Sequence, residues 1–298
     1  MSRSPRRSPF KRAVRAAALL FRNDAPPPLT DRELRQAFLK RARRLTPFVA
    51  VESEGLLFFV STRDKLGRKV FVERERQDMV VLADALRLLG QHGAEVRRPM
   101  FVDVGANLGT TTVTAMKRHG FTSAVALEPE PTNFRTLRLN LVANDLDSEV
   151  TALCVAASDR AGEGRLEISS RSSGTHSLVD TADAAADGTI GVRTVTLDEL
   201  VDEGTIAADE VGLLWVDTPD AEATVLAGAS TLLRRGVPLV AAVRADRPAW
   251  PKARSELIRL LGGYTHFASL RPDPALSQDL PSILDAFTRA GDFLAFRA

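Results

Sequence analysis

Two carboxylates flank a short glycine-containing turn in this sequence, Asp103 before it and Glu128 beyond it. The turn reads "DVGANLG" and carries Gly105 and Gly109. A dinucleotide-binding turn needs G-x-G-x-x-G, and a nucleoside-triphosphate loop ends in Gly-Lys-Ser/Thr. Asn107 stands at the second dinucleotide glycine and no lysine follows Gly109, so the sequence has neither phosphate-binding pattern.

The charges around the turn indicate a different ligand. Asp103 would repel a pyrophosphate and attract an ammonium group. Glu128 ends the next expected strand, about 20 residues after the turn, where an acid accepts hydrogen bonds from ribose hydroxyls. A ligand with a ribose, an amino group and no required phosphate matches S-adenosylmethionine. The alternative is a tight strand-to-helix turn with Glu128 in solvent.

The expected elements around these residues alternate between strand and helix. Apolar strands are predicted at 100–105, 123–128, 149–158, 212–217, 237–243 and 292–296, and helices at 108–120, 131–144, 221–236 and 280–291. Such alternation favours a parallel sheet covered on both faces. A polar insert between 158 and 212 contains two further β-like pieces, 164–169 and 192–197.

The N-terminal third is organised differently. The spacing of Thr30 and Glu33 predicts a capping box, and Leu34, Ala37, Phe38 and Leu45 form an apolar face that is expected to dock. Two β-rich runs around 63–68 predict a hairpin, and a helix is expected over 78–93. We therefore divide the chain into a basic arm (1–28), a helix, hairpin and helix region (29–98) and a ligand-binding α/β domain (99–298).

Composition limits the function classes. The 298 residues carry a net charge of only +2, but the arm has seven Lys or Arg between Ser2 and Arg22 and no acid. This arm is expected to be disordered, and weak contact with an acidic or membrane surface is the alternative.

Cys154 is the one cysteine and is expected to be a small buried side chain. No disulfide framework, membrane span or secretory signal is predicted, so a cytoplasmic location is expected.

Five blocks together resemble the FkbM family of S-adenosylmethionine-dependent methyltransferases. The blocks are "FVDVGANLGTTT", "ALEPEPTNFRTLRLNL", "VAASDRAGEGRLEIS", "TVTLDEL" and "LLWVDTPDAEATVLAGASTLL". The resemblance implies a class I methyltransferase fold, which is a Rossmann-like, mostly parallel seven-stranded sheet with an antiparallel last strand. It also implies O-methylation of a hydroxyl group on a sugar or natural-product small molecule.

By motif position, the resemblance assigns cofactor-binding residues. Asp103 and Thr111 would lie near the methionyl end, and Glu128 would bind the ribose. The backbone turn would comprise Gly105, Ala106, Asn107 and Gly109. Ser158 and Asp159 would lie at the adenine edge, where the Asp159 carboxylate could accept a hydrogen bond from the adenine amino group.

The acceptor side departs from the family pattern Asp-x-Gln-Gly-x-Glu. Here it reads "DTPDAE", so Pro219 and Asp220 replace the Gln and Gly, and Ala242 occupies a position that often carries Glu. Asp217, at a strand end, and Glu222 are the catalytic candidates, with helix capping as their alternative role.

His176, in the insert, is more typical of a solvent-facing residue than of a catalytic base. The proximity of Asp217, Asp220 and Glu222 is the only support for a cation site, so no metal is predicted.

Other functions fit less well. A nucleic-acid methyltransferase of the adenine type needs a second Pro and an aromatic residue after the fourth strand, and "DTPD" has neither. A dehydrogenase lacks its fingerprint. The second interpretation that stays open is a cofactor-binding module that has lost catalysis, because the acceptor side is altered. The expected partner is a hydroxylated small molecule, and the sequence does not indicate an oligomeric state.

Overall fold

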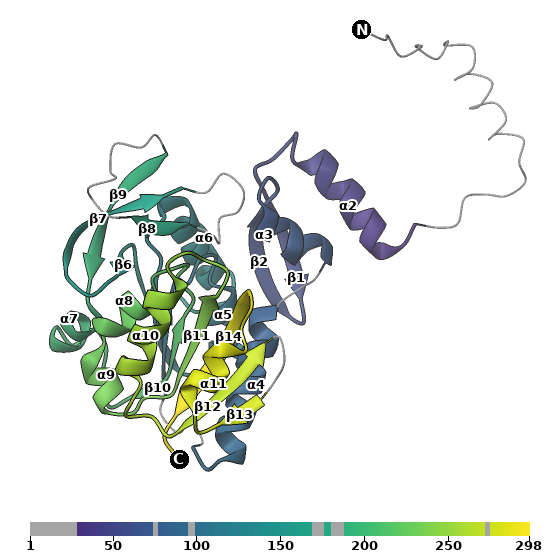
Figure 1. The fold of residues 1–298 in the computed structure, drawn as a ribbon. Coiled ribbons are helices and arrows are strands. Elements are labelled where there is room, and N and C mark those ends of the chain that lie inside the picture. The colour runs from purple at the N-terminus through teal and green to yellow at the C-terminus, as the bar shows by residue number, and fades with distance from the viewer. Residues whose placement is uncertain (1–28, 74–76, 95–98, 169–175, 180–187, 272–274) are drawn as a thin grey trace, which may run out of the picture.

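The central feature of the computed structural model is one large sheet (Figure 1). The model describes residues 29–73, 77–94, 99–168, 176–179, 188–271 and 275–298, so the predicted basic arm lies outside the described residues. In spatial order the sheet contains β13 (Ala275–Ser277), β12 (His266–Arg271), β14 (Ala290–Phe296), β11 (Leu239–Arg244), β10 (Val211–Val216), β3 (Met100–Val104), β4 (Ser123–Leu127) and β5 (Val150–Leu153).

The strand directions confirm the expected fold class. Strands β5, β4, β3, β10 and β11 are parallel, and the last strand, β14, runs antiparallel between β11 and β12. The short strand β13 adds an unpredicted eighth strand at the edge, paired antiparallel with β12. Because the parallel strands share one direction, their carboxyl ends lie along one edge of the sheet, where open α/β sheets bind ligands.

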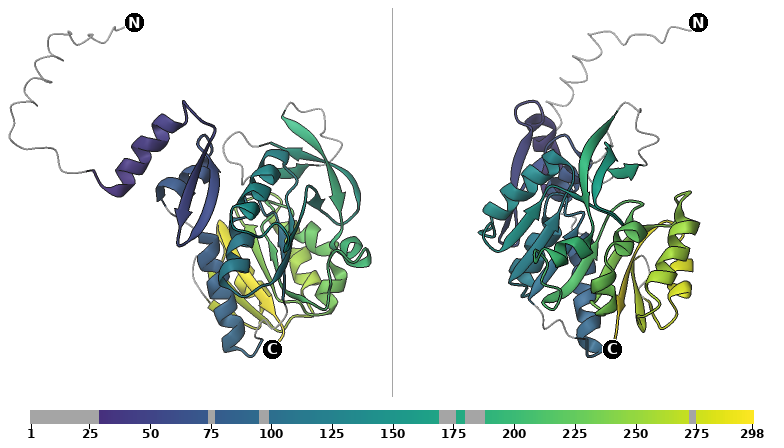
Figure 2. Two further views of the ribbon diagram at one scale, coloured as in Figure 1. Left: turned by 180° about the vertical axis from the view of Figure 1, so that it is seen from behind. Right: turned by 90° about the vertical axis from the view of Figure 1, so that its left-hand side faces the viewer.

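Helices cover both faces of this sheet, as the two views in Figure 2 show. One face packs against α4 (Gln77–Gln91), α5 (Thr110–Arg118) and α6 (Pro131–Val142). The other packs against α7 (Leu197–Asp202), α8 (Glu222–Ala227), α9 (Ser230–Arg234), α10 (Trp250–Leu260) and α11 (Leu280–Asp285). Side chains alternate between two hydrophobic clusters, so that Trp215 faces the α4 side while Leu214 and Val216 face the α8 side.

Helix α4 is built into these layers although it precedes the first sheet strand in sequence. Its buried side chains Val81, Leu82, Ala85 and Leu89 belong to the same cluster as Phe101 of β3. Their spacing places one face of the helix on the sheet. The start of α4 is thereby fixed beside the carboxyl edge of the sheet.

The N-terminal helix α2 (Asp31–Ala42) begins as predicted, but only part of its predicted apolar face docks, since Phe38 stacks on Phe71 with ring centroids 5.6 Å apart. Thr30 Oγ1 accepts from the Glu33 N–H at 3.3 Å, and the Glu33 carboxylate accepts from the Thr30 N–H at 2.8 Å, which confirms the capping box. Leu34 and Leu45 are 51% and 87% exposed, whereas Leu39 is buried. The docking prediction was wrong for Leu34 and Leu45, because the neighbouring segment contacts the side of α2 that carries Leu39 and Arg35, whose Nε donates to Val72 O.

The predicted hairpin around residues 63–68 is also wrong. The hairpin instead pairs β1 (Phe48–Ser53) with β2 (Leu56–Ser61) through Glu54 and Gly55, both at positive φ. Residues 65–68 of this stretch are helical because the Asp64 carboxylate accepts from the N–H groups of Leu66 and Gly67, which starts α3 (Lys65–Arg68). A π-helix, η1 (Lys69–Glu73), follows directly.

The polar insert forms a second, four-stranded sheet among the described residues. Its order is β6 (Ala156–Ala157), β9 (Thr189–Val195), β7 (Gly162–Glu167) and β8 (Ser177–Val179), which confirms both β-like pieces. Cys154 is exposed, contrary to expectation, because β5 ends at Leu153 and leaves the cysteine in the connection. No helix within the described ranges has the length and apolar character needed to cross a bilayer.

Candidate functional site

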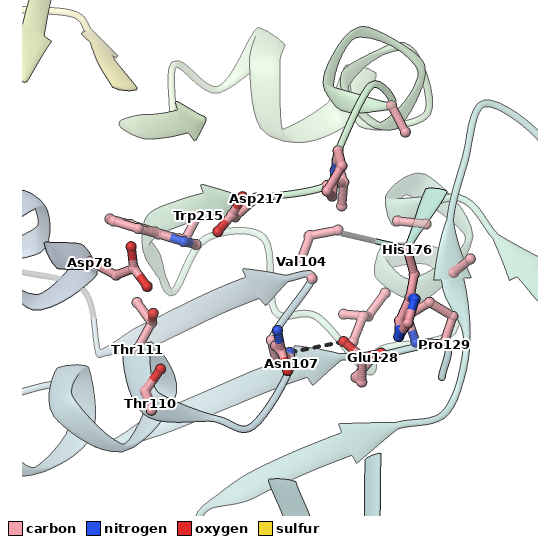
Figure 3. A pocket seen from close by; sticks show the side chains of 18 of the residues that line it. Asp78, Val104, Asn107, Thr110, Thr111, Glu128, Pro129, His176, Trp215 and Asp217 are labelled. Atoms are coloured by element: carbon pink, nitrogen blue, oxygen red, sulfur yellow. Dashed lines mark hydrogen bonds between the residues drawn. The ribbon is translucent and has the colours of Figure 1, made fainter. Parts of the chain in front are cut away.

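A cavity of about 290 Å³ lies at the carboxyl edge of the sheet. Its lining comes from the turn after β3, the ends of β4 and β10, the second sheet, and the N-terminal segment through α3, η1 and the start of α4. Figure 3 shows Asp78, Thr111, Trp215 and Asp217 at one end and Glu128, Pro129 and His176 at the other. We refer to these as the Asp217 end and the Glu128 end.

The glycine turn lies between the two ends. The N–H groups of Gly105 and Ala106 both donate to Leu127 O, at 3.0 and 2.9 Å, which ties the turn to the end of β4. Gly105 has a φ of +86°, and a Cβ there would lie 2.1 Å from Asp217 O. Only glycine fits this position, so the turn presents bare backbone to the cavity.

Glu128 is held in place by the same turn. Its Oε2 accepts from the Asn107 N–H at 2.9 Å (Figure 3) and its Oε1 from the Glu130 N–H at 2.8 Å. Burial raises the pKa of Glu128 to about 7, although these two N–H groups favour the charged form. Oε1 also accepts from Asn133 Nδ2 at 3.4 Å, whereas Oε2 retains a second lone pair, with which Glu128 can accept from a hydroxyl group in the cavity.

Asp103 lies beneath the turn and does not line the cavity. It is 1% exposed, and its Oδ2 accepts from Thr112 Oγ1 at 2.5 Å. Burial raises its pKa to about 7 although the Thr112 hydroxyl opposes this change. Thr111, which precedes Thr112 in the chain, does line the cavity. Of the two residues predicted at the methionyl end, Asp103 and Thr111, only Thr111 is therefore positioned to touch a ligand.

Asp217 lines the cavity at the end of β10, as expected for a residue that contacts ligand. Burial raises its pKa to about 8, and the charge of Asp78 is the largest of the charge effects that add to this rise. Trp215 and Asp78 lie on the same side of Asp217 in Figure 3. Sequence reasoning missed both: Asp78 looks like an ordinary first-turn helix acid, and Trp215 like a core strand residue.

Besides Asp103, four of the predicted residues do not line the cavity. A Cβ on Gly109 would meet Leu137 Cδ1 at 2.5 Å, so this glycine allows close packing of α6. Ser158 and Asp159 bond to each other at 3.2 Å outside the cavity, where Val155, Ala156 and Ala157 form the wall instead. Glu222 is buried at the start of α8, and burial raises its pKa well above the ordinary value.

The altered acceptor motif has a structural explanation. Asp220 has a φ of +67°, a conformation that favours the glycine of the family pattern, and its carboxylate pairs with Arg247 at 3.3 Å. Ala242 pairs in register with Asp292 of β14, which is 2% exposed and forms an ion pair with Arg271. A carboxylate therefore lies beside the position of the missing glutamate, on the neighbouring strand.

His176 lines the Glu128 end of the cavity. Burial lowers its pKa, which favours the neutral imidazole at pH 7, although the charges of Glu130 and Asp64 act in the opposite direction. This position is away from Asp217, so the structure does not bring His176 together with the catalytic candidates.

The cavity residues fit an adenosine that carries an amino acid. Two buried polar atoms of lining residues, Asn107 Oδ1 and Thr218 Oγ1, have no hydrogen-bond partner within the described part of the chain. A ligand hydroxyl or ammonium group would satisfy Asn107 Oδ1. Bare backbone at Gly105, the apolar wall at 155–157 and the carboxylates at both ends supply the remaining contacts. Over the residues described, no group of His, Cys, Asp or Glu is arranged to hold a metal ion.

Comparison with known proteins confirms the family resemblance. Residues 103–274 match the model of the methyltransferase FkbM domain. The 31-O-demethyl-FK506 methyltransferase FkbM of Streptomyces tacrolimicus is 30% identical over 164 residues, or 52% of this chain and 58% of that protein. The chain thus matches little more than half the length of this relative.

Solved structures that align with the chain include several methyltransferases, of which two are described. Methyltransferase FkbM from Methylobacillus flagellatus KT is 13% identical, with a TM-score of 0.42 over 67% of this chain and 44% of that chain. A SAM-dependent methyltransferase from Agrobacterium tumefaciens is 8% identical, with a TM-score of 0.45 over 85% of this chain and 70% of that chain.

Proposed function

Because the chain belongs to the FkbM methyltransferase family, we propose that it transfers a methyl group from S-adenosylmethionine to a hydroxyl group of a sugar or another natural-product small molecule. The observation that carries this proposal is the bare turn at Gly105, which faces a cavity with a carboxylate at each end. No pyrophosphate-binding pattern accompanies it. Asp78 and Asp217 at one end suit a ligand group that carries positive charge, whereas Lys65 and Lys69 line the same cavity.

The Glu128 end holds the adenosine. Glu128 accepts from the ribose hydroxyls, while Val155, Ala156 and Ala157 pack against the adenine ring. The backbone at Gly105 and Ala106 allows the nucleoside to approach the sheet closely. These groups bind and orient, and they leave the opposite end for the methionyl group and the acceptor.

The Asp217 end is where methyl transfer takes place. When bound, S-adenosylmethionine supplies a methyl group already activated by its sulfonium charge, so the chain mainly aligns the acceptor and excludes water. Asp217 and Thr111 contact the methionyl group or the acceptor, and Trp215 forms an apolar wall beside them. Glu222 lies outside the cavity at the start of α8, where its buried carboxylate accepts from the backbone of Asp220 and so holds the loop that precedes this helix.

Calorimetric titration with S-adenosylmethionine tests the cofactor assignment. Glu128→Ala should weaken binding by about tenfold to hundredfold, because the hydrogen bonds from the ribose hydroxyls are lost. Glu130→Gln is the matched control: Glu130 caps α6 by accepting from the Asn133 N–H at 2.7 Å, so its replacement should lower stability and leave affinity unchanged. Unchanged affinity in Glu128→Ala would rule out the ribose assignment.

A second function is favoured by the altered loop at Pro219 and Asp220. In this alternative the chain binds S-adenosylmethionine without methylating an acceptor and acts as a regulatory or interaction module. The test is S-adenosylhomocysteine formation in the presence of extracts rich in hydroxylated metabolites. Tight cofactor binding with no product in any extract would favour the module over the enzyme.

A further inference from the structure

Two buried asparagines of α6 pair with the edge of β2 that faces away from β1, as a neighbouring strand would. Asn144 Oδ1 accepts from the Leu57 N–H at 3.0 Å, and Asn144 Nδ2 donates to Leu57 O at 2.7 Å. Asn140 pairs with the N–H and C=O of Phe59 in the same way, at 2.6 and 3.3 Å. Four helix residues rise about 6 Å and two strand residues about 6.7 Å, so the two amides match the spacing of the strand edge.

Asn140 makes one more hydrogen bond, which joins β2 to the glycine turn. Its Nδ2 carries two hydrogens and also donates to Leu108 O of the turn, at 2.7 Å. The additional hydrogen bond of Asn144 is donated to Asn140 O within α6, also at 2.7 Å. Within the described part of the chain, Asn140 is therefore the one of these two asparagines that connects the turn to β2.

Strand β2 belongs to a segment that forms one side of the cavity, residues 48–73, which we call the N-terminal wall. A Cβ on Gly67 would lie 2.0 Å from Ser61 O, so α3 packs directly on the end of β2. The position of β2 therefore determines how the wall faces the cavity. Three residues of the wall line the cavity, namely Lys65, Leu66 and Lys69.

The glycine turn is held from two directions. On the cavity side the Asn107 N–H donates to Glu128 Oε2 at 2.9 Å, and on the α6 side Leu108 O accepts from Asn140. Asn140 is 0% exposed and Leu108 is 4% exposed, so water cannot readily replace either partner if their hydrogen bond is lost. A nucleoside that binds against the turn restrains the same backbone segment that Asn140 holds.

Resting on the proposed function, we propose that Asn140 is a positioning residue that couples cofactor binding at the turn to docking of the N-terminal wall. A cofactor bound against the turn restrains Leu108, which keeps the Asn140 amide in the orientation that also pairs with Phe59. The docked wall in turn raises cofactor affinity by the same factor, because coupling between two binding equilibria is reciprocal. Cofactor binding thereby completes the acceptor side of the cavity before the acceptor enters.

Hydrogen exchange of the Leu57 and Phe59 amides, followed by NMR, tests the coupling. Asparagine side chains hold both N–H groups, so these amides exchange when the wall separates from α6. In the wild type, saturating S-adenosylhomocysteine should slow the exchange of both amides at least about fivefold.

Asn144→Leu is the matched control for Asn140→Leu, because each variant loses two hydrogen bonds to β2 but only Asn140→Leu loses the bond to Leu108. In Asn144→Leu the ligand should still slow exchange at Phe59 by the wild-type factor. In Asn140→Leu it should no longer slow exchange at Leu57. Calorimetry should show S-adenosylhomocysteine affinity reduced about fivefold or more in Asn140→Leu and less than about twofold in Asn144→Leu.

Other outcomes overturn the inference. Slowing by the ligand that persists in Asn140→Leu would mean that direct contacts between ligand and wall carry the coupling. Equal losses of affinity in the two variants would mean that docking of β2 matters and its connection to the turn does not. No slowing in the wild type, despite binding, would exclude coupling altogether.

Two further arms keep the result interpretable. If Asn140→Leu does not fold, Asn140→Ser replaces it, since the serine side chain is too short to bridge Leu108 and Phe59, and the same two outcomes are expected. A wild-type protein that binds neither S-adenosylmethionine nor S-adenosylhomocysteine would contradict the proposed function itself.

Discussion

The Glu128 end of the cavity is built from two consecutive strand-turn-helix units, whereas the Asp217 end is assembled from segments far apart in the chain. At the first, the turn after β3 and Glu128 after β4 hold each other through the Asn107 N–H. At the second, Asp78, Asp217 and Arg271 meet from α4, β10 and β12. The first end depends on backbone shape, and the second on a balance of charges.

This difference indicates which end of the cavity tolerates substitutions during evolution while the other end keeps its structure. Backbone contacts at Gly105 depend on a conformation that one residue type adopts, so few substitutions are tolerated. Charges at the Asp217 end can be moved between neighbouring strands, as Asp292 beside Ala242 illustrates. We therefore expect the adenosine to be held by parts of the chain that vary little, and the methionyl group and acceptor by parts that vary more.

The largest effect is expected from Gly105→Ala. The new Cβ would lie 2.1 Å from Asp217 O at a φ of +86°, so either the turn or the end of β10 must move. Stability should fall by about 3 kcal/mol or more, and S-adenosylmethionine binding should become undetectable. Urea unfolding and calorimetry measure the two effects.

Gly120→Ala is the matched control for this change. Gly120 has a φ of +77° but nothing within 4 Å of the added Cβ, so only backbone strain remains. We expect a loss of about 1 kcal/mol and unchanged binding. Equal losses of stability and of binding in the two variants would mean that the close approach of Gly105 to Asp217 O contributes nothing. The Glu128 end would then not depend on backbone shape.

The same difference explains what could be predicted from the sequence. The alternation of strands and helices, the turn at Gly105 and Glu128 are local patterns, and the structure places Gly105 and Glu128 at the cavity. Asp78 was read only as part of a helix, because no local pattern relates it to Asp217, which follows 139 positions later in the numbering. Three-dimensional packing of α4 on the sheet creates that relation.

The errors in the N-terminal region have a similar cause. The runs around 63–68 have β-forming composition, but β2 pairs with residues 48–53 once Asp64 caps α3. The capping role of Asp64 could have been recognised, since Asp before a short helix is a common start. The exposed position of Leu34 could not, because which face of α2 is covered depends on η1.

Breaking the ion pair between Asp292 and Arg271 at the Asp217 end is expected to give the next largest effect. Asp292→Ala leaves the partly buried Arg271 guanidinium without this carboxylate, and we expect a loss of about 3 kcal/mol in unfolding free energy. Asp285→Ala removes an exposed pair with Arg254 at 2.6 Å and should cost below about 1 kcal/mol. Equal losses in urea unfolding would mean that burial of the pair contributes nothing.

The pH dependence of ligand affinity also distinguishes the two ends of the cavity, and it is the smallest of the effects that we predict. The pKa of Asp217 is raised to about 8, so this acid gains its charge as the pH rises from 6 to 8. A cationic ligand beside it favours the charged form, so binding releases a proton and affinity increases with pH. For S-adenosylmethionine we expect a rise of about tenfold between pH 6 and 8, measured by calorimetry in two buffers of different ionisation enthalpy.

Adenosine isolates the other end, because it carries the ribose and no cation. Glu128 has a pKa raised to about 7, but hydroxyl groups donate to either protonation state of a carboxyl group. Adenosine affinity should therefore change less than about threefold over the same range, and Asp217→Asn should flatten the S-adenosylmethionine profile towards it. If the affinities of adenosine and S-adenosylmethionine changed equally with pH, the pH dependence would arise at Glu128. The Glu128 end would then be the one that depends on charge, contrary to the comparison made above.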